Sequence, residues 1–216
     1  MVQSGQPEAD VRILLVDDHS LFTRGLQLLL SDLDSNAQCV IANSIAQAVG
    51  QAGPFDLVLL DYALPDSGGC TGLSSVLAAH PGVPVVMLSG ETRLELVQTL
   101  IEAGAAGFIS KASDTDLLLG ALRTVLAGGT YLPKQLLGVA SPASKERLHD
   151  FTPRQLEVVL KLIQGKPNKT IARELGMTEN TVKTHLAAAF RTLGVNNRTE
   201  AVFKAAALGL MPNWSQ

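Results

Sequence analysis

Three aspartates, a serine and a lysine directly follow apolar runs of the chain, and together they suit phosphoryl chemistry. Asp17 and Asp18 follow the first run, Asp61 the third, Ser89 the fourth and Lys111 the fifth. A carboxylate can attack a phosphoryl group and form an aspartyl phosphate. A hydroxyl and an ammonium can hold the transferred oxygens, and Mg²⁺ relieves the repulsion among clustered carboxylates. We therefore predict a metal-dependent phosphoacceptor pocket.

The elements that must position these side chains are five short strands separated by helical segments. The predicted strands cover residues 11–16, 38–42, 55–60, 83–88 and 107–110. Near-continuous apolar strands alternating with helices are typical of a doubly wound α/β fold, with one parallel sheet covered on both faces. Ligands of such folds bind outside the carboxyl ends of the strands, where all five polar residues fall. The last helix of this region is predicted to be capped by Ser113 and to run to Ala127.

The remainder of the chain shows only helical patterns after a linker. Residues 129–149 contain two prolines, small residues and mixed charges, which predicts a linker with one short helix. Thr152, Thr178 and Asn197 then open helices, with Gln155 completing a capping box. We expect a doubly wound α/β domain over 10–128, the linker over 129–149, and an all-α four-helix helix-turn-helix domain over 150–216.

Charge and composition divide the chain in the same way. Residues 1–148 carry 8 Lys and Arg against 15 Asp and Glu, whereas residues 149–216 carry 9 against 5. An acidic body with a basic tail favours nucleic-acid binding by the tail. No apolar run is long enough to span a bilayer, no secretion signal is visible, and the 2 cysteines lack metal-type spacing. We expect a cytoplasmic protein with reduced thiols.

The segment 170–193 has the helix, tight turn and helix of a DNA-binding helix-turn-helix. The N-terminal end of the second helix meets base edges in such motifs, which makes Lys183 and Thr184 the candidates for base contacts. Other polar residues around this motif are candidates for phosphate contacts, which set affinity and register. These candidates are Lys166, Lys169, Thr178, Asn180, Thr181, Arg191 and Arg198.

Four segments of the first domain carry a family resemblance. ILLVDDHSLFTRGL, DLVLLDYALPDSGG, VPVVMLSGE and GAAGFISK resemble the receiver domain of two-component response regulators. The resemblance implies that Asp61 accepts a phosphoryl group from a histidine kinase, that Ser89 and Lys111 bind this group, and that Phe108 is the aromatic that swings inward on activation. It also implies a magnesium site formed by Asp17, Asp18, Asp61 and the main-chain carbonyl of Ala63.

The second domain resembles another family. The segment FTPRQLEVVLKLIQGKPNKTIARELGMTENTVKTHLAAAFRTLGVNNRTEAV closely resembles the LuxR-type DNA-binding domain. A receiver joined to this module is the arrangement of the NarL/FixJ branch of response regulators. That resemblance implies an active homodimer on double-stranded promoter DNA, paired through the last helix at Val202, Ala205 and Leu208.

These features predict a transcription factor switched by Mg²⁺-dependent phosphorylation of Asp61, and not an enzyme. One alternative is a regulator of the same fold that binds DNA without phosphorylation and has a vestigial pocket. A second is a phosphohydrolase of the haloacid dehalogenase type. That class places an acid two residues after its nucleophile, whereas Ala63 stands there in this chain. None of the four histidines shows metal-ligand spacing, so no catalytic role is predicted for them.

Overall fold

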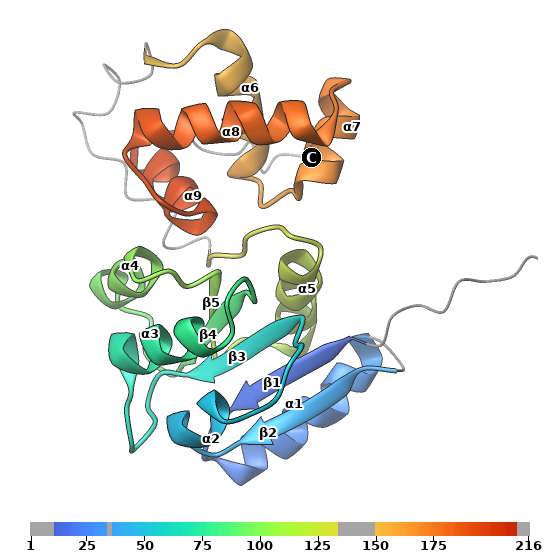
Figure 1. Cartoon of the computed structure of the whole chain (residues 1–216), viewed down its shortest axis with the longest axis vertical. Helices are drawn as coiled ribbons and strands as arrows, with labels where there is room; N and C mark the ends of the chain where they lie inside the picture. The colour runs from blue at the N-terminus through green and yellow to red at the C-terminus, as the bar shows by residue number, and fades with distance from the viewer. Residues whose placement is uncertain (1–10, 34–35, 134–149, 211–216) are drawn as a thin grey trace, which may run out of the picture.

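A computed structural model describes residues 11–33, 36–133 and 150–210 of the chain. Its first half is a five-stranded parallel sheet between two layers of helices (Figure 1), which confirms the predicted fold class. The strand order is β2-β1-β3-β4-β5. The strands are β1 (Arg12–Val16), β2 (Gln38–Ala42), β3 (Leu57–Asp61), β4 (Val85–Ser89) and β5 (Gly107–Ser110).

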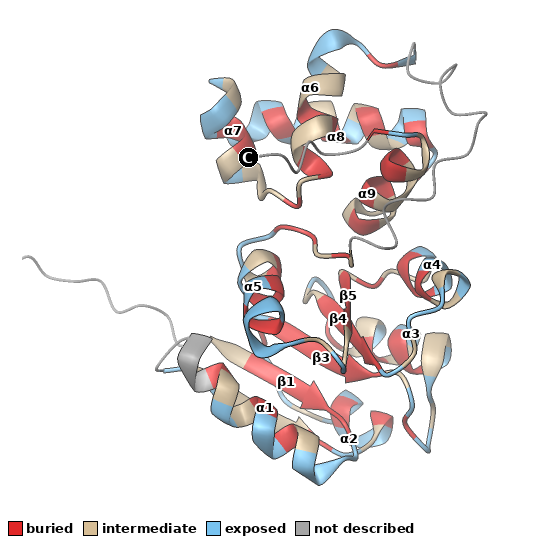
Figure 2. Ribbon diagram, turned by 180° about the vertical axis from the view of Figure 1, so that it is seen from behind, coloured by how far each residue is buried: buried red, intermediate tan, exposed pale blue. Residues whose placement is uncertain are grey.

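Alternate residues of the central strands supply the cores on the two faces of the sheet. On β1, Leu14 and Val16 join the core under one helix layer, whereas Ile13 and Leu15 join the core under the other. Because both faces are covered, these strands are apolar throughout, as Figure 2 shows by their continuous burial. Polar side chains can therefore stand only where the strands end.

The helices of the first half alternate with the strands along the chain. They are α1 (Ser20–Leu33), α2 (Ile45–Val49), α3 (Gly69–Ala79), α4 (Leu94–Glu102) and α5 (Thr115–Leu126). The predicted cap of the last helix is wrong by one residue. Asp114, rather than Ser113, caps α5, and its Oδ1 accepts the Leu117 N–H at 2.8 Å. Ser113 instead closes a turn, since its N–H donates to the Ser110 carbonyl.

The second half consists of four helices among the described residues. These are α6 (Pro153–Leu162), α7 (Asn168–Leu175), α8 (Glu179–Leu193) and α9 (Arg198–Ala207). The capping box of Thr152 and Gln155 is present, and Thr178 and Asn197 cap α8 and α9 as predicted. The short helix predicted within the linker falls on residues 134–149, which lie outside the described residues.

The two halves of the chain are in contact. Figure 1 shows α9 standing over α4 and β5, and buried side chains of both halves form one continuous core cluster. The Thr130 N–H donates to the Gly165 carbonyl at 3.2 Å, which ties the end of the first half to the α6–α7 turn. The first half thus presents one end of its sheet to solvent and one flank to the helices.

Candidate functional site

The carboxyl ends of β1, β3 and β5 bring together the acidic and basic residues of the predicted pocket. Asp17 and Asp61 are buried, with 0% and 2% of their surface exposed. The Lys111 Nζ lies 2.7 Å from Asp17 Oδ2 and 2.9 Å from Asp61 Oδ2. Asp18 lies at the mouth of the pocket and is exposed. The parallel register of the strands therefore gathers residues that are 94 positions apart in the sequence, from Asp17 to Lys111.

The charges of this pocket are coupled through Lys111. Burial alone lowers the pKa of the Lys111 ammonium, but its contacts with Asp17 and Asp61 outweigh burial and raise that pKa above its usual value. The ammonium also lies 4.8 Å from the centre of the Phe22 ring, a further stabilising contact for a cation. Lys111 is therefore held charged and directed at the two buried carboxylates.

The donor set of the pocket fits a hard divalent cation. Asp17 Oδ2 and Asp61 Oδ2 are buried, and within hydrogen-bond distance they have no partner among the described residues except the Lys111 ammonium. Three carboxylates against one ammonium leave an excess of negative charge. Asp17, Asp18 and Asp61 each present an oxygen to one small region, the oxygen donors that Mg²⁺ prefers. Ala63 lines the same opening, a cavity of about 590 Å³ above Asp61.

Ser89 and Phe108 lie behind the pocket. Ser89 is buried at the end of β4, and its Oγ accepts the Glu91 N–H at 3.0 Å. Phe108, on β5, is fully buried in the core cluster that reaches the helical half. The Ser89 hydroxyl is therefore bound to the β4–α4 loop, whereas the Phe108 ring belongs to the core cluster that includes residues of α9.

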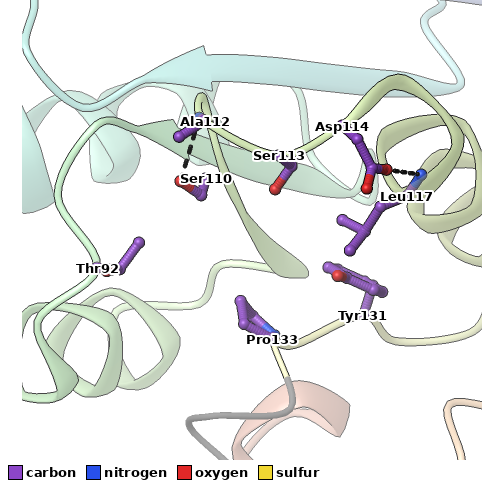
Figure 3. Close-up of a pocket in the computed structure, with 8 residues that line it drawn as sticks. All are labelled: Thr92, Ser110, Ala112, Ser113, Asp114, Leu117, Tyr131 and Pro133. Carbon is purple, nitrogen blue, oxygen red and sulfur yellow. Dashed lines mark hydrogen bonds between the residues drawn. The ribbon is translucent and has the colours of Figure 1, made fainter.

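A second hollow opens beside β5, where the β5–α5 loop meets the segment leaving the first half (Figure 3). Its volume is about 420 Å³, and hydroxyls and a carboxylate surround it. Burial raises the pKa of Tyr131 in its wall, and the nearby Asp114 carboxylate raises it further. The lining residues are Thr92, Ser110, Ala112, Ser113, Asp114, Leu117, Tyr131 and Pro133.

In the second half, α7 and α8 form a helix-turn-helix with an open outer face. Gly176 ends α7 in the left-handed conformation, with φ of 62°, which lets the chain turn into α8. The Thr178 Oγ1 accepts the Thr181 N–H at 3.1 Å and fixes the start of α8. Most predicted DNA-contacting residues around this motif are exposed together. They are Lys169, Thr178, Asn180, Thr181, Lys183, Thr184 and Arg191.

Two of the residues predicted to contact phosphates bind other residues of the protein in this structure. The Lys166 Nζ pairs with Glu174, and Lys161 pairs with the same carboxylate at 2.8 Å. The Arg198 guanidinium donates to the Asn168 side chain and to the Lys166 carbonyl, and burial lowers its pKa to about 10. The structure thus gives Arg198 a structural role between α9 and α7, which differs from the phosphate contact expected.

The contact between the halves is made by the start of α9. The Thr199 Oγ1 donates to the Ala106 carbonyl at 3.0 Å, and the Asn197 Nδ2 donates to the Ile101 carbonyl at 3.3 Å. Both acceptors lie at the end of α4 or in the turn before β5. Sequence reasoning missed this contact because it joins residues more than 90 positions apart and neither side chain carries a charge. In the sequence, the only feature that could have pointed to this contact was the predicted Asn197 cap.

The residues predicted to pair two subunits are not a free surface in this structure. Val202 and Ala205 are buried, with 2% and 0% of their surface exposed, and Leu208 is half-buried. Val202 follows Thr199 by three residues, so it shares the side of α9 that faces the first half. Pairing through Val202 and Ala205 therefore requires these two side chains to become exposed.

Comparisons with known proteins agree with this division of the chain. The family model described as response regulator receiver domain matches residues 13–123. The model described as bacterial regulatory proteins, luxR family, matches residues 149–205. Together they cover the pocket, the helix-turn-helix and most of α9.

Two curated relatives align with most of the chain, and one solved structure aligns with part of it. A glycerol metabolism activator from Pseudomonas putida is 32% identical, over 90% of this chain and 94% of its own length. The nitrate/nitrite response regulator protein NarL of Escherichia coli strain K12 is 32% identical, over 88% and 92%. The crystal structure of a LuxR family DNA-binding response regulator from Silicibacter pomeroyi is 33% identical, with a TM-score of 0.52, over 58% of this chain and 98% of that one.

This protein belongs to the response regulators that join a receiver domain to a LuxR-type DNA-binding domain. It is a transcriptional regulator of a two-component system, a class that acts by binding DNA. Receiver domains typically bind Mg²⁺ at an acidic pocket, and the cluster of Asp17, Asp18 and Asp61 is such a pocket. No helix within the described ranges combines the length and hydropathy needed to cross a bilayer.

Proposed function

We propose that Mg²⁺-dependent phosphorylation of Asp61 by a sensor histidine kinase controls promoter binding by this protein. The observation that carries the proposal is the pairing of one ammonium, that of Lys111, with two buried carboxylates, Asp17 and Asp61. In this proposal, the receiver domain of residues 10–128 carries out the phosphoryl chemistry, and the domain of residues 150–216 recognises DNA. Residues 129–149 link the two domains.

In the phosphotransfer step, an Asp61 carboxylate oxygen attacks the phosphorus of the phosphohistidine of the kinase. A phosphorus–oxygen bond forms as the phosphorus–nitrogen bond breaks, and the histidine leaves with its electron pair and takes up a proton. Asp17, Asp18, Asp61 and the Ala63 carbonyl would hold Mg²⁺, which would supply positive charge to offset the charge of the phosphoryl oxygens. Lys111 offers these oxygens its ammonium, and Ser89 offers its hydroxyl once it gives up the Glu91 N–H.

The new charge acts on the flank where α9 is docked. When Lys111 and Ser89 turn toward the phosphoryl group, the ends of β4 and β5 change, and Phe108 on β5 packs in the core cluster shared with the helical half. This is a charge-driven bias on an element with two arrangements. Release of α9 exposes Val202 and the face it shares with Thr199, which allows two subunits to pair on DNA.

In the DNA complex, Lys183 and Thr184 read base edges from the exposed start of α8. Lys169, Thr178, Asn180, Thr181 and Arg191 hold phosphates, with Lys166 joining them where it leaves Glu174. The face of α8 is open while the receiver is docked, so the docked receiver limits pairing through α9 rather than access to α8.

Intact-mass measurement with acetyl phosphate tests the first step. We expect one phosphoryl adduct on the full-length protein with Mg²⁺, none with a chelator, and none on Asp61→Asn. Asp56→Asn is the matched control, since Asp56 is an exposed carboxylate at the other end of β3. An adduct that persists on Asp61→Asn would contradict the assignment. DNA binding that is equal with and without the adduct would favour the regulator with a vestigial pocket.

A further inference from the structure

His19 lies directly beside the acidic pocket and has no part in the function proposed above. Its Nδ1 is 3.1 Å from Asp17 Oδ1, 3.1 Å from Asp18 Oδ1 and 3.7 Å from Asp61 Oδ2. One donor atom from each of these four residues lies within 4.8 Å of the other three. The imidazole is therefore a member of the cluster and not merely its sequence neighbour.

The spacing of these atoms is that of ligands around one metal ion. Donors bound at about 2.1 Å to an octahedral ion lie about 3.0 Å apart when they are adjacent. The two separations of 3.1 Å are compatible with this value, and the one to Asp17 is also a hydrogen bond in this structure. The main-chain N–H of His19 also donates to Asp17 Oδ1 at 2.9 Å, which holds the backbone of His19 against that carboxylate.

The ring stands where an arriving ion can reach it. The His19 side chain is 63% exposed, whereas Asp17 and Asp61 are buried. His19 also lines the cavity above Asp61, together with Ala63 and Lys111. The buried carboxylates thus form the floor of the site, and the imidazole nitrogen forms part of its rim.

We propose that His19 is a direct metal ligand and makes this site bind late first-row transition ions, such as Co²⁺ and Zn²⁺, in preference to Mg²⁺. The inference rests on the metal site of the proposed function. Mg²⁺ takes oxygen ligands and keeps several waters, so a neighbouring imidazole adds little to its binding. The later transition ions accept imidazole nitrogen readily, and a nitrogen added to two or three carboxylates raises their affinity selectively.

The test compares Co²⁺ and Mg²⁺ binding by full-length wild type, His19→Asn and His19→Gln. Co²⁺ is followed by its visible absorption, which changes when nitrogen replaces oxygen as a ligand, and Mg²⁺ by calorimetry. We expect both variants to bind Co²⁺ at least about tenfold more weakly, since even partners of metal ligands cost tenfold or more. Mg²⁺ affinity should stay within about twofold in both variants, because oxygen ligands dominate its binding.

His185→Asn is the matched control, because His185 is a half-buried histidine on α8 of the other domain. An equal loss of Co²⁺ binding in this control overturns the inference, since the ion would then be bound elsewhere. Unchanged Co²⁺ affinity and spectrum in both His19 variants also overturn it and reduce His19 to a hydrogen-bonding neighbour. Wild type that binds neither ion overturns the proposed metal site itself, so the two failures are distinguishable.

Discussion

In the receiver pocket the ionisable groups are buried and touch one another, whereas on the outer face of α8 they are exposed and spaced apart. Asp17 and Asp61 share one ammonium at 2.7 and 2.9 Å. Lys183 and Arg191 are exposed to solvent and lie about two turns apart on one helix. The first arrangement makes each charge depend on its neighbours, and the second lets each charge act alone.

This difference separates the two tasks of a response regulator. Charges that are buried together respond strongly to one added phosphoryl group, because little solvent screens them. Exposed cations bind a polyanion through the release of its counterions, which makes binding additive and dependent on salt. The hydrogen bonds from the start of α9 to Ile101 of α4 and to Ala106 before β5 join the two halves, and the side chains that make them are uncharged.

The largest expected effect comes from removing the lysine of the pocket. We predict that Lys111→Met lowers the free energy of unfolding by about 3 kcal/mol without Mg²⁺, because two buried carboxylates lose their partner. Mg²⁺ should recover much of this loss. The Lys111 pKa is raised, so its contribution is complete below the ordinary value of 10.5 and is lost as pH rises through the higher folded-state value.

Urea unfolding with and without Mg²⁺ measures this effect. Lys161→Met is the control, since Lys161 pairs with Glu174 at the surface and should change stability by less than about 1 kcal/mol. Equal losses in the two variants would remove the distinction between a coupled interior site and independent surface charges.

A smaller effect is expected on the DNA-facing side. Lys183→Ala should weaken binding to a DNA fragment selected by the phosphorylated wild type by about 2 kcal/mol, the cost of one base contact. Lys166→Ala should cost less, because Glu174 already neutralises that ammonium. Fluorescence anisotropy at several salt concentrations measures both. A greater loss for Lys166→Ala than for Lys183→Ala would contradict the assignment of α8 as the reading helix.

At the junction, Thr199→Val removes one hydrogen bond and keeps the shape of the side chain. The Ala106 carbonyl then loses its donor, which costs the docked state about 1 kcal/mol. We expect the unphosphorylated variant to bind the same DNA about fivefold more tightly than wild type, the equivalent of that energy. Thr192→Val is the control, since Thr192 donates to a carbonyl of its own helix. An unchanged DNA affinity of Thr199→Val would contradict the proposal that docking of α9 limits DNA binding.

The smallest effect concerns the helical domain alone. Thr152→Ala removes the cap of α6 and should lower the free energy of unfolding by about 1 kcal/mol. Phosphoryl uptake at Asp61 should be unchanged, because the cap lies far from the pocket in sequence and in fold. Calorimetry measures the free energy of unfolding, and intact mass measures phosphoryl uptake. Impaired phosphoryl uptake would contradict this prediction, because it would show that a change at the start of α6 reaches the receiver pocket.

Local patterns sufficed to predict the sheet and the members of the pocket. Each strand is apolar because both of its faces are covered, and each pocket residue follows a strand, so Asp61 and Lys111 could be placed without the structure. The α5 cap was wrong because Ser113 and Asp114 are both good cap residues, and the turn that engages Ser113 is formed only in the folded loop.

Features that depend on long-range packing could not be predicted. Burial of Arg198 between α7 and α9 shows only when Asn168 and the Lys166 carbonyl are in place. His19 was not predicted as a ligand, because spacing along the sequence does not show that its ring lies against a pocket formed by several strands. The docking of Thr199 on the Ala106 carbonyl depends on the placement of two domains, which no local pattern encodes.

The central claim is that a phosphoryl group on Asp61 separates α9 from the receiver. Energy transfer between fluorophores on Ser74→Cys of α3 and Thr192→Cys of α8, both exposed positions, tests it in a chain that carries Cys39→Ala and Cys70→Ser. At concentrations too low for pairing, acetyl phosphate with Mg²⁺ should lower the transfer in this chain and leave it unchanged when Asp61→Asn is added. Unchanged transfer in a chain whose mass shows the adduct would contradict the account.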